Sequence, residues 1–461
     1  MFFSNQAGDN KMAQSSGHRF DSVWVKSGVI AALTVLMLWP LARVENLVSE
    51  RQARQHQAEE VISSGFGGAQ IIGAPILSVD TEERSVIADP ANRTSTEEWS
   101  AGCPLHLTPN NVRIVTDAAV EVRSKGIYSV PVYVSKVVIT GDFMPDAIAG
   151  LLAPRADTRV LMSHAVLQLP LSGLKYLRAL TRFEVGGQAL HAASGHLAGF
   201  AALTAPLDLK SIDRTSPLEF RIEFEVAGSD TLHFLPLAST TFVTARIGWP
   251  HPDFDGAFLP VSRDLDAQGY SATWQVLELN RAIPQIWRGA SVTNAGLLAT
   301  AFGVRLFQPS NIYSQNYRAV RYGILFVVIT FACFFAWEHL VRGLRLHPMQ
   351  YLLVGLSLAT FYLLLLALSE HVGFAASYAI GAAALVTLIT TYIAGATANR
   401  NAALSIGGAL AASYGVLYVI LLSDDYALLL GSLLLFLILA ALMLATRRLD
   451  WAKVGREDAP P

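Results

Sequence analysis

The chain combines long apolar runs at both ends with a middle region in which hydrophobic residues recur at every second position. The first apolar run covers residues 23–41 and contains Lys26, whose side chain we expect to snorkel toward lipid headgroups. About 20 apolar residues suffice to cross the hydrocarbon core of a bilayer. The pattern therefore predicts a membrane helix at 23–42, which residues 43–68 continue as a juxtamembrane helix ending in a Gly-rich turn.

A cleaved signal peptide is the alternative interpretation of this first run, because the apolar core of a signal peptide is also short. The sequence Trp39-Pro40-Leu41-Ala42-Arg43 lacks a small residue at the first position of a cleavage site. We therefore favour an uncleaved membrane anchor.

The middle of the chain has the period of an antiparallel β-sheet. Residues 220–226 alternate apolar and charged side chains, which puts one face on a core and the other in water. Residues 112–143 have a similar period, with turns predicted at Lys125-Gly126 and Gly141-Asp142. The positions expected to face inward are Val120, Val122, Tyr128, Val130, Val132 and Val134.

The stretch 82–111 interrupts this pattern with several prolines and charges, and we expect a long surface loop there. The β-rich region has about 250 residues, which is enough for a substantial core. A β-sandwich and a pair of small β-rich subdomains both remain open.

Five further apolar runs follow residue 317, and each is long enough to cross a bilayer. They cover residues 322–341, 349–368, 372–394, 402–422 and 426–445. The short connections alternate in charge, the basic ones with Arg342, Arg345 and Arg400 and the acidic ones with Glu370, Asp424 and Asp425. The positive-inside rule places the basic connections in the cytoplasm. Both termini are then cytoplasmic and the β-rich region lies outside.

The composition agrees with a membrane protein. Of the 461 residues, 52% are hydrophobic and 15% are charged, whereas soluble proteins have about 25% charged residues. The formal net charge of −2 gives no sign of a basic patch of the kind that attracts nucleic-acid phosphates, so we expect no nucleic-acid partner. The two cysteines, Cys103 and Cys333, lie in the β-rich region and in an apolar run, so we expect both to be free thiols.

Four polar residues in the acidic connections are the first candidate site, namely Glu370, His371, Asp424 and Asp425. Three carboxylates and one imidazole on one side of the membrane could form a cation or proton site. The alternative is that the acidic residues simply mark solvated outside loops. His347 is a further candidate, but about 30 Å of helix separates it from Glu370, and its position before Pro348 is typical of a helix start.

The turn that contains Trp249 and His251 is the second candidate site. Two prolines stiffen the sequence WPHPDFDG at residues 249–256, which presents an aromatic ring, a histidine and two carboxylates. The turn is interpreted either as a ligand site or as a packing corner between strands. The remaining histidines are scattered, with no zinc spacing and no nucleophile elbow, so we predict no metal, no cofactor and no catalytic residues.

Several local sequences resemble the CreD family of bacterial inner-membrane proteins. They are RLHPMQYLLVGLSL (345–358), FYLLLLALSEH (361–371), WPHP (249–252), FLP (258–260) and ALLLG (427–431). The resemblance implies a protein of the Gram-negative inner membrane that contributes to envelope integrity or stress response, with its outside domain in the periplasm. It supplies no reaction and no catalytic residues. In an oxidising periplasm the lone thiol of Cys103 is best tolerated if it is buried.

The predicted fold class is a membrane α protein with a β-rich soluble domain, which is mainly antiparallel. The predicted segments are a disordered cytoplasmic tail (1–22), transmembrane helix 1 (23–42), a juxtamembrane helix and Gly-rich turn (43–68), a periplasmic β-rich domain (69–319), a five-helix transmembrane cluster (320–446) and a cytoplasmic tail (447–461).

Three functions stay open from the sequence. The favoured one is a non-enzymatic envelope protein whose periplasmic domain binds an envelope component or protein partner, with the lipid bilayer as its other partner. The second is a transporter or lipid-handling protein with Glu370, His371, Asp424 and Asp425 at its outer mouth. The third is a membrane-bound hydrolase that brings together histidines such as His164, His233 and His251. The oligomeric state does not follow from the sequence.

Overall fold

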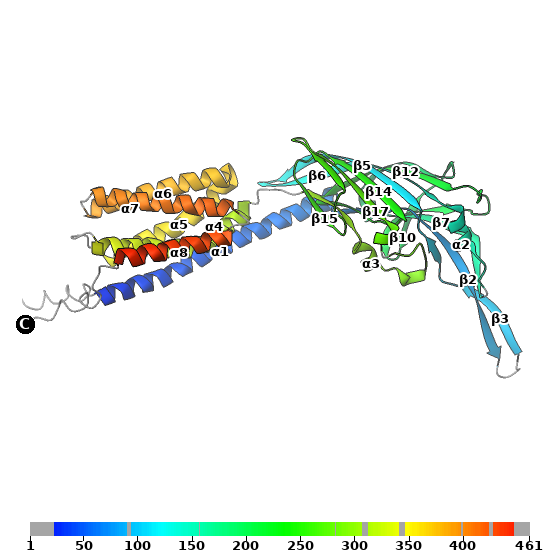
Figure 1. The fold of residues 1–461 in the computed structure, drawn as a ribbon, viewed down its shortest axis with the longest axis horizontal. Coiled ribbons are helices and arrows are strands. Elements are labelled where there is room, and N and C mark those ends of the chain that lie inside the picture. The colour runs from blue at the N-terminus through cyan, green and yellow to red at the C-terminus, as the bar shows by residue number, and fades with distance from the viewer. Residues whose placement is uncertain are drawn as a thin grey trace, which may run out of the picture. The chain divides into compact units, whose positions relative to one another are not determined.

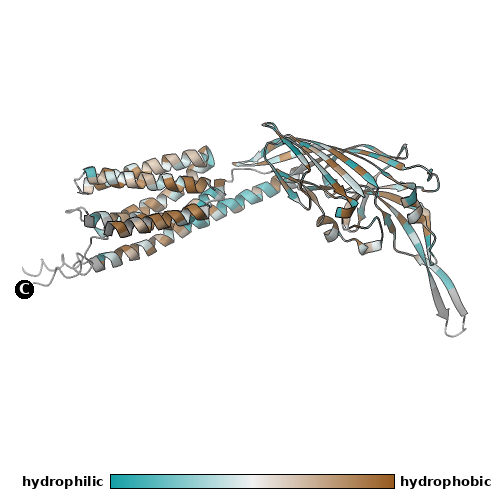
Figure 2. Cartoon of the chain, in the orientation of Figure 1, coloured by the Kyte–Doolittle hydropathy of each residue, from teal (hydrophilic) through white to brown (hydrophobic). Residues whose placement is uncertain are grey.

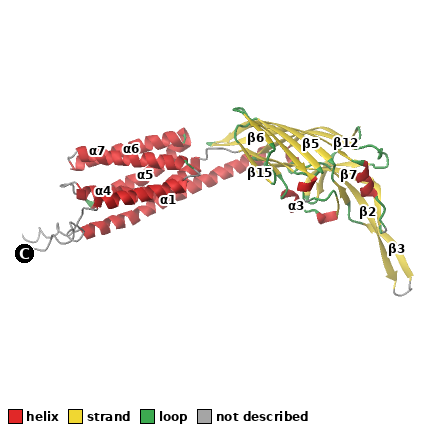
Figure 3. Ribbon diagram, in the orientation of Figure 1, coloured by secondary structure: helices red, strands yellow, loops and turns green. Residues whose placement is uncertain are grey.

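The computed structural model describes residues 23–89, 94–155, 157–281, 283–306, 312–340, 346–397, 400–423 and 427–446. The chain divides into two compact units, one containing α1 up to Arg54 together with the C-terminal helices, and the other running from Gln55 to Pro309. We call them the helical unit and the β unit. Figure 3 shows the same division, with strands confined to the β unit among the described residues. The predicted fold class is confirmed.

The helical unit contains the first part of α1 and five C-terminal helices. Their bounds are α1 (Val23–Phe66), α4 (Ile312–Leu340), α5 (Pro348–Val372), α6 (Phe374–Thr397), α7 (Arg400–Leu422) and α8 (Ala427–Thr446). Among the described residues, α1, α4, α5, α6 and α7 are long and apolar enough to cross a membrane. Helix α8 adds another apolar stretch of 20 residues. Figure 2 shows the apolar colour along α4–α8 and the hydrophilic colour on the later turns of α1.

Helix α1 packs against α4 and α5 through one narrow face. Met37, Leu41, Val44 and Val48 recur at helical spacing and are all buried. Glycines on the facing helices make room for these side chains, because a Cβ on α5 Gly355 would lie 2.9 Å from the Met37 sulfur. Small residues at such positions let membrane helices approach closely.

Within the described residues the β unit contains three sheets (Figure 1). The eight-stranded sheet has the order β16 (Ser262–Leu265), β17 (Tyr270–Leu277), β14 (Thr240–Ile247), β5 (Asn111–Lys125), β6 (Tyr128–Phe143), β12 (Leu218–Ser229), β8 (Leu177–Val185) and β9 (Gln188–Ala189). The seven-stranded sheet contains β10 (Ala193–Leu197), β11 (Phe200–Leu207), β7 (Thr158–Pro170), β2 (Ile76–Asp89), β4 (Leu105–Leu107) and β18 (Ile286–Arg288), and β3 (Thr94–Ala101) pairs with β2.

The smallest sheet has the order β1 (Gln70–Ile72), β13 (Thr231–Phe234), β19 (Phe302–Leu306) and β15 (Pro252–Gly256). Two short helices, α2 (Pro145–Leu152) and α3 (Asn294–Leu298), complete the unit. The described strand pairs are antiparallel except β14 with β5 and β1 with β13. The inward positions predicted for residues 220–226 are confirmed, since Phe220, Ile222, Phe224 and Val226 all lie in the core.

The surface loop expected at residues 82–111 is wrong. Strands β2 and β3 pair antiparallel from Glu82 with Ala101 to Asp89 with Thr94, and form a long hairpin (Figure 1). Two of the prolines that suggested a loop, Pro104 and Pro109, fall between strands. Charged and polar residues recur along β2 and β3 without a regular apolar alternation, so the hydrophobic pattern could not reveal this pairing.

The turn expected at Gly141-Asp142 is also wrong, because both residues lie within β6. At Gly141 strands β5 and β6 approach each other too closely for a side chain, since a Cβ there would lie 2.2 Å from the carbonyl oxygen of Asn111. The turn at Lys125-Gly126 is confirmed, with Gly126 at φ +64°.

The inward face predicted for residues 120–134 is only partly correct. Val130 and Val132 are buried, but Val122 is 53% exposed. Strand β5 pairs with β14 only as far as Ala118, so Val122 lies beyond the body of the sheet.

Both cysteines are free thiols, as expected, and both are exposed. The burial expected for Cys103 is therefore wrong. Its backbone is held at the sheet edge by Glu83, which accepts from the Cys103 N–H at 3.0 Å, and by the Thr81 hydroxyl, which donates to its carbonyl at 2.8 Å.

Candidate functional site

Glu370 lies in a polar cluster that joins three helices of the helical unit. Its carboxylate, in the last turn of α5, accepts a hydrogen bond from the Tyr313 hydroxyl of α4 at 3.0 Å. The guanidinium of Arg51 on α1 lies 3.9 Å from the same carboxylate oxygen. Beside them, buried Asn316 donates to the hydroxyl of buried Ser369 at 2.8 Å. Glu370 is only 12% exposed, so its charge is balanced within the protein.

Among the described residues, the cluster's hydrogen bonds and ion pair include neither His371 nor His347. His371 is exposed at the end of α5. Asp424 and Asp425 lie outside the described residues, so the four-residue outer site stays a prediction. His347 caps the opposite end of α5, where its Nδ1 accepts from the Met349 N–H at 3.2 Å. The 25 residues of α5 separate the two ends by about 37 Å.

A second carboxylate, Glu338 of α4, was missed in the sequence. It accepts from the ammonium of Lys26 in α1, from the Leu346 N–H at 3.2 Å and from the Tyr351 hydroxyl at 3.3 Å. The side chains of Lys26 and Glu338 are 17% and 8% exposed. Lys26 and Glu338 thus form an ion pair within the helical unit. The sequence does hold a signal for this pair, because one apolar run contains a single cation, Lys26, and another contains a single carboxylate, Glu338.

The candidate turn at Trp249 belongs to the β unit and leads into strand β15. Trp249 packs against the core, and its ring meets the His251 ring edge-on at 6.3 Å. His251 itself is exposed. The two aspartates of the turn, Asp253 and Asp255, both reach Arg305 on the neighbouring strand β19. The turn thus packs on one side and delivers two carboxylates on the other.

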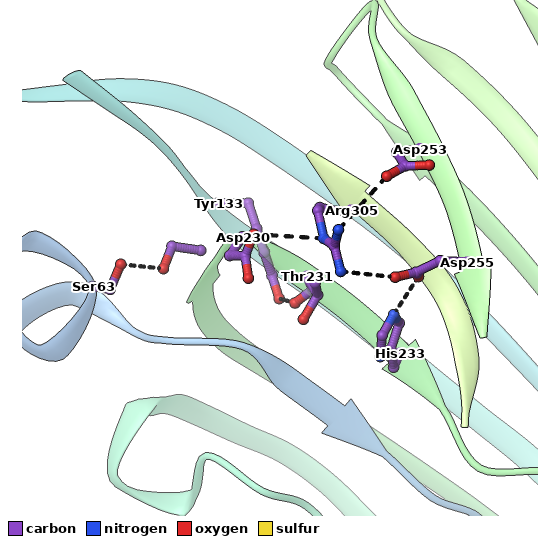
Figure 4. A network of polar contacts seen from close by, with 9 residues as sticks. Ser63, Tyr133, Asp230, Thr231, His233, Asp253, Asp255 and Arg305 are labelled. Carbon is purple, nitrogen blue, oxygen red and sulfur yellow. Dashed lines mark hydrogen bonds and ion pairs between the residues drawn. The ribbon is translucent and has the colours of Figure 1, made fainter. Parts of the chain in front are cut away.

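Arg305 is the centre of an ionic network on the four-stranded sheet (Figure 4). Its guanidinium lies 3.1 Å from Asp255, 3.8 Å from Asp253 and 4.0 Å from Asp230. The Nε2 of His233 lies 2.6 Å from the other oxygen of Asp255. Since the Arg305 side chain is 48% exposed, each contact contributes about 0–1 kcal/mol.

The same region holds the end of α1. Ser229, which precedes Asp230, donates from its hydroxyl to that of Ser63 on α1 at 2.9 Å (Figure 4). The Tyr176 hydroxyl donates to the Ser64 carbonyl at 2.9 Å. The helix ends at Phe66, and the next residue, Gly67, has φ +151° and a position at which a Cβ would lie 2.4 Å from the Ala227 carbonyl oxygen. Asp230, at one end of the Arg305 network, therefore follows directly on the residue that contacts α1.

The histidines named for a hydrolase are dispersed. His164 is exposed on β7, His233 pairs with Asp255, and His251 lies beside Trp249. Among the described residues, no hydrogen bond or ion pair joins any two of these three histidines. The described part of the chain also holds no group of three His, Cys, Asp or Glu side chains placed to bind a metal ion.

A serine and a histidine do meet elsewhere in the β unit, in a buried hydrogen-bonded chain. The Ser78 hydroxyl donates to the Gln168 side-chain oxygen at 2.6 Å, and the Gln168 amide nitrogen donates to the His196 carbonyl at 2.9 Å. The Nδ1 of His106, 2.7 Å from Ser78, must then be the donor. A serine nucleophile needs the opposite arrangement, in which the histidine accepts its proton. These hydrogen bonds link four strands of the seven-stranded sheet, namely β2, β4, β7 and β10.

His106 makes the stability of the β unit depend on pH. Burial lowers the pKa of His106 to about 4, below the value of about 6.5 in an unfolded chain. As the pH falls, the unfolded state therefore binds this proton before the folded state does. The contribution of His106 to stability is fully present above pH 6.5 and is lost as the pH drops toward 4. The expected loss is about 3 kcal/mol.

Denaturant unfolding of the wild type and of His106→Phe between pH 7 and pH 4 measures this loss. The phenylalanine keeps an aromatic ring beside Trp287 and removes the titrating group. The matched control is His251→Ala, at an exposed histidine, which keeps the wild-type slope. Equal pH slopes for the wild type and His106→Phe would contradict the prediction.

Comparisons with known proteins agree with this architecture. A family model described as "Inner membrane protein CreD" matches residues 22–452. The inner membrane protein CreD of Escherichia coli (strain K12) is 29% identical over 431 residues, which make up 93% of each chain. Both matches include α1, the β unit and the C-terminal helices.

Proposed function

The chain belongs to the CreD family of inner-membrane proteins, and from this premise we propose that its β unit lies on the periplasmic side and binds a component of the cell envelope. Through this binding the protein contributes to envelope integrity. The helices α1 and α4–α8 hold the unit at the membrane.

The cluster around Glu370 is the observation that supports this orientation most directly. It brings together Arg51 from the later part of α1, Tyr313 from the start of α4 and Glu370 from the end of α5. The chain of the β unit leaves α1 and enters α4 at this end of the helices. The opposite end carries the basic connection with Arg342 and Arg345. The positive-inside rule makes that basic end cytoplasmic.

Labelling of Cys103 tests the orientation. This thiol is exposed in the β unit, so a membrane-impermeant maleimide is expected to label it in intact spheroplasts. Cys103→Ser reports any background from Cys333. Asn401→Cys in the Cys103→Ser chain, at an exposed position in the first turn of α7, is expected to react only after permeabilisation. Labelling of Cys103 only after permeabilisation would contradict the proposal.

Photo-crosslinking tests the binding. Contiguous exposed apolar patches often mark binding sites, and among the large apolar side chains of the β unit Leu279 and Val261 are 95% and 70% exposed. A photoreactive residue at either position in the full chain is expected to crosslink an envelope component in cells. Lys136, which is 75% exposed, is the control position. Failure of every position to crosslink, or an equal yield at Lys136, would remove the support for binding.

A groove between α6 and α7 favours lipid handling as a second candidate function. It has a volume of about 430 Å³ and is lined by small and aromatic residues that include Ala383, Ala411, Gly415 and Tyr418. Ala383→Trp would fill the groove. If this variant loses envelope integrity as fully as a deletion while Leu279 still crosslinks its partner, the lipid-handling function replaces the binding function.

A further inference from the structure

The hairpin of β5 and β6 extends beyond the sheet to which it belongs. The two strands pair with each other as far as Lys125 with Tyr128. Their outer neighbours stop earlier, because β14 pairs with β5 only up to Ala118 and β12 pairs with β6 only from Val132. Residues 122–131 therefore form a two-stranded ribbon with no third strand among the described residues (Figure 1). Isolated two-stranded ribbons are marginally stable in water, so another surface is needed to stabilise this one.

The tip of the ribbon is both apolar and basic. Residues 121–127 are all exposed, and they include two aliphatic side chains, Val122 at 53% and Ile127 at 50% exposed. Arg123 and Lys125 lie between them in the sequence. Aliphatic side chains beside cations suit the boundary between headgroups and acyl chains of a bilayer.

Further cations surround the place where the ribbon meets α1. The guanidinium groups of Arg123 and Arg178 lie over the Phe66 ring, at 5.6 Å and 4.7 Å from its centroid. Lys175 comes three residues before Arg178 in the sequence, and its ammonium lies over the ring of Tyr176. Together with Lys125 these residues make four cations. The carboxylate of Glu121 pairs with Arg123, so the net charge of the group is +3. A surface of this charge is complementary to the phosphates of anionic lipids.

The chain joins this face directly to α1, a helix long and apolar enough to cross a membrane. Phe66 is the last residue of α1, and Arg51 is in contact with the helical unit through Glu370. The 15 residues from Gln52 to Phe66 belong to α1 and span about 22 Å of helix. So short a connection gives the lipid surface a high effective concentration at the ribbon, so that weak contacts suffice for binding.

We propose that the tip of the β5–β6 ribbon, residues 121–128, binds the surface of the lipid bilayer. Ile127 and Val122 enter the interfacial region, and Lys125, Arg123, Lys175 and Arg178 contact headgroup phosphates. The alternation along β5 puts Val122 on the apolar face of the strand, yet Val122 is exposed, and contact with the bilayer explains this exposure. The contact is independent of the side of the membrane on which the β unit lies, and so does not rest on the proposed function.

An environment-sensitive fluorophore at the tip tests this contact in the full chain. Ile127→Cys is combined with Cys103→Ser and Cys333→Ser, labelled with a nitrobenzoxadiazole dye, and placed in nanodiscs of phosphatidylcholine with or without phosphatidylglycerol. The emission is expected to shift to the blue and to be quenched by spin-labelled lipids in the anionic discs. Added salt reverses the shift because it screens the charges. A label at Gln188→Cys, at an exposed position on β9, stays unchanged.

Charge variants show whether the cations at the tip are responsible for the shift. In the labelled chain Lys125→Glu is expected to remove most of the shift, whereas Lys136→Glu, on β6 away from the tip, leaves it intact. Equal emission in both kinds of disc would overturn the proposal. So would a shift that appears only with two copies per disc, because the surface would then bind a second copy of the chain.

Discussion

Replacing Glu338 with alanine is expected to lower the free energy of unfolding of the helical unit by about 3–5 kcal/mol, the cost of breaking a buried ion pair from one side. The substitution leaves the nearly buried Lys26 without its counter-ion. It also removes the acceptor for the Tyr351 hydroxyl and the Leu346 N–H. Thermal unfolding of the full chain in detergent, followed by helical circular dichroism, measures the effect.

Glu370→Ala is the matched control at the other end of the same helices. Its partner Arg51 is 38% exposed and 3.9 Å away, so the loss is expected to be about 1 kcal/mol or less. The double variant Lys26→Met with Glu338→Gln should recover much of the stability, because neither charge then lacks a partner. Equal losses for Glu338→Ala and Glu370→Ala would show that the Lys26 pair has no special role.

Replacing Trp274 with alanine is expected to destabilise the β unit by about 3–5 kcal/mol, the usual cost of a large cavity in a core. Trp274 on β17 is fully buried. Its ring lies 6.3 Å from Phe234, 5.9 Å from Phe254 and 6.0 Å from Phe302. These three rings come from β13, β15 and β19, so Trp274 links the eight-stranded sheet to the four-stranded one. Hydrogen exchange in the strands of both sheets measures the loss.

Two further substitutions define the origin of this effect. Trp274→Phe should cost less than about 1.5 kcal/mol, because most of the volume stays and the indole N–H, which is buried without a partner, is removed. Leu279→Ala, at a side chain that is 95% exposed, should change stability by less than about 0.5 kcal/mol. A small loss for Trp274→Ala would mean that the two sheets are held together elsewhere.

Hydrophobic pattern alone revealed the membrane helices and much of the sheet. The run predicted at 349–368 is the centre of α5 (Pro348–Val372), because length and apolarity are local properties. The order of the strands is not local. Strand β14 pairs in parallel with β5, so that Thr240 lies beside Asn111, and no period in either strand indicates its neighbour.

The polar clusters differ in how visible they are in the sequence. Glu370 could be singled out because it follows an apolar run, but its contact with Arg51 depends on how α1 packs. Arg305, Asp255 and His233 come from three strands, and only the register of β13, β19 and β15 brings them together. Geometry of this kind follows from the folded sheet and from no spacing along the chain.

The order of elements along the chain delays assembly of the helical unit. Helix α1 is synthesised first, yet its partners Glu338 and Glu370 follow the whole β unit. At about 5–20 residues per second, roughly 15 to 60 s pass between the synthesis of Arg54 and that of the end of α5. During this time α1 is in the membrane as a lone helix with Lys26 unpaired. The nascent protein is therefore a single-span anchor first and a bundle only after its β unit has been made.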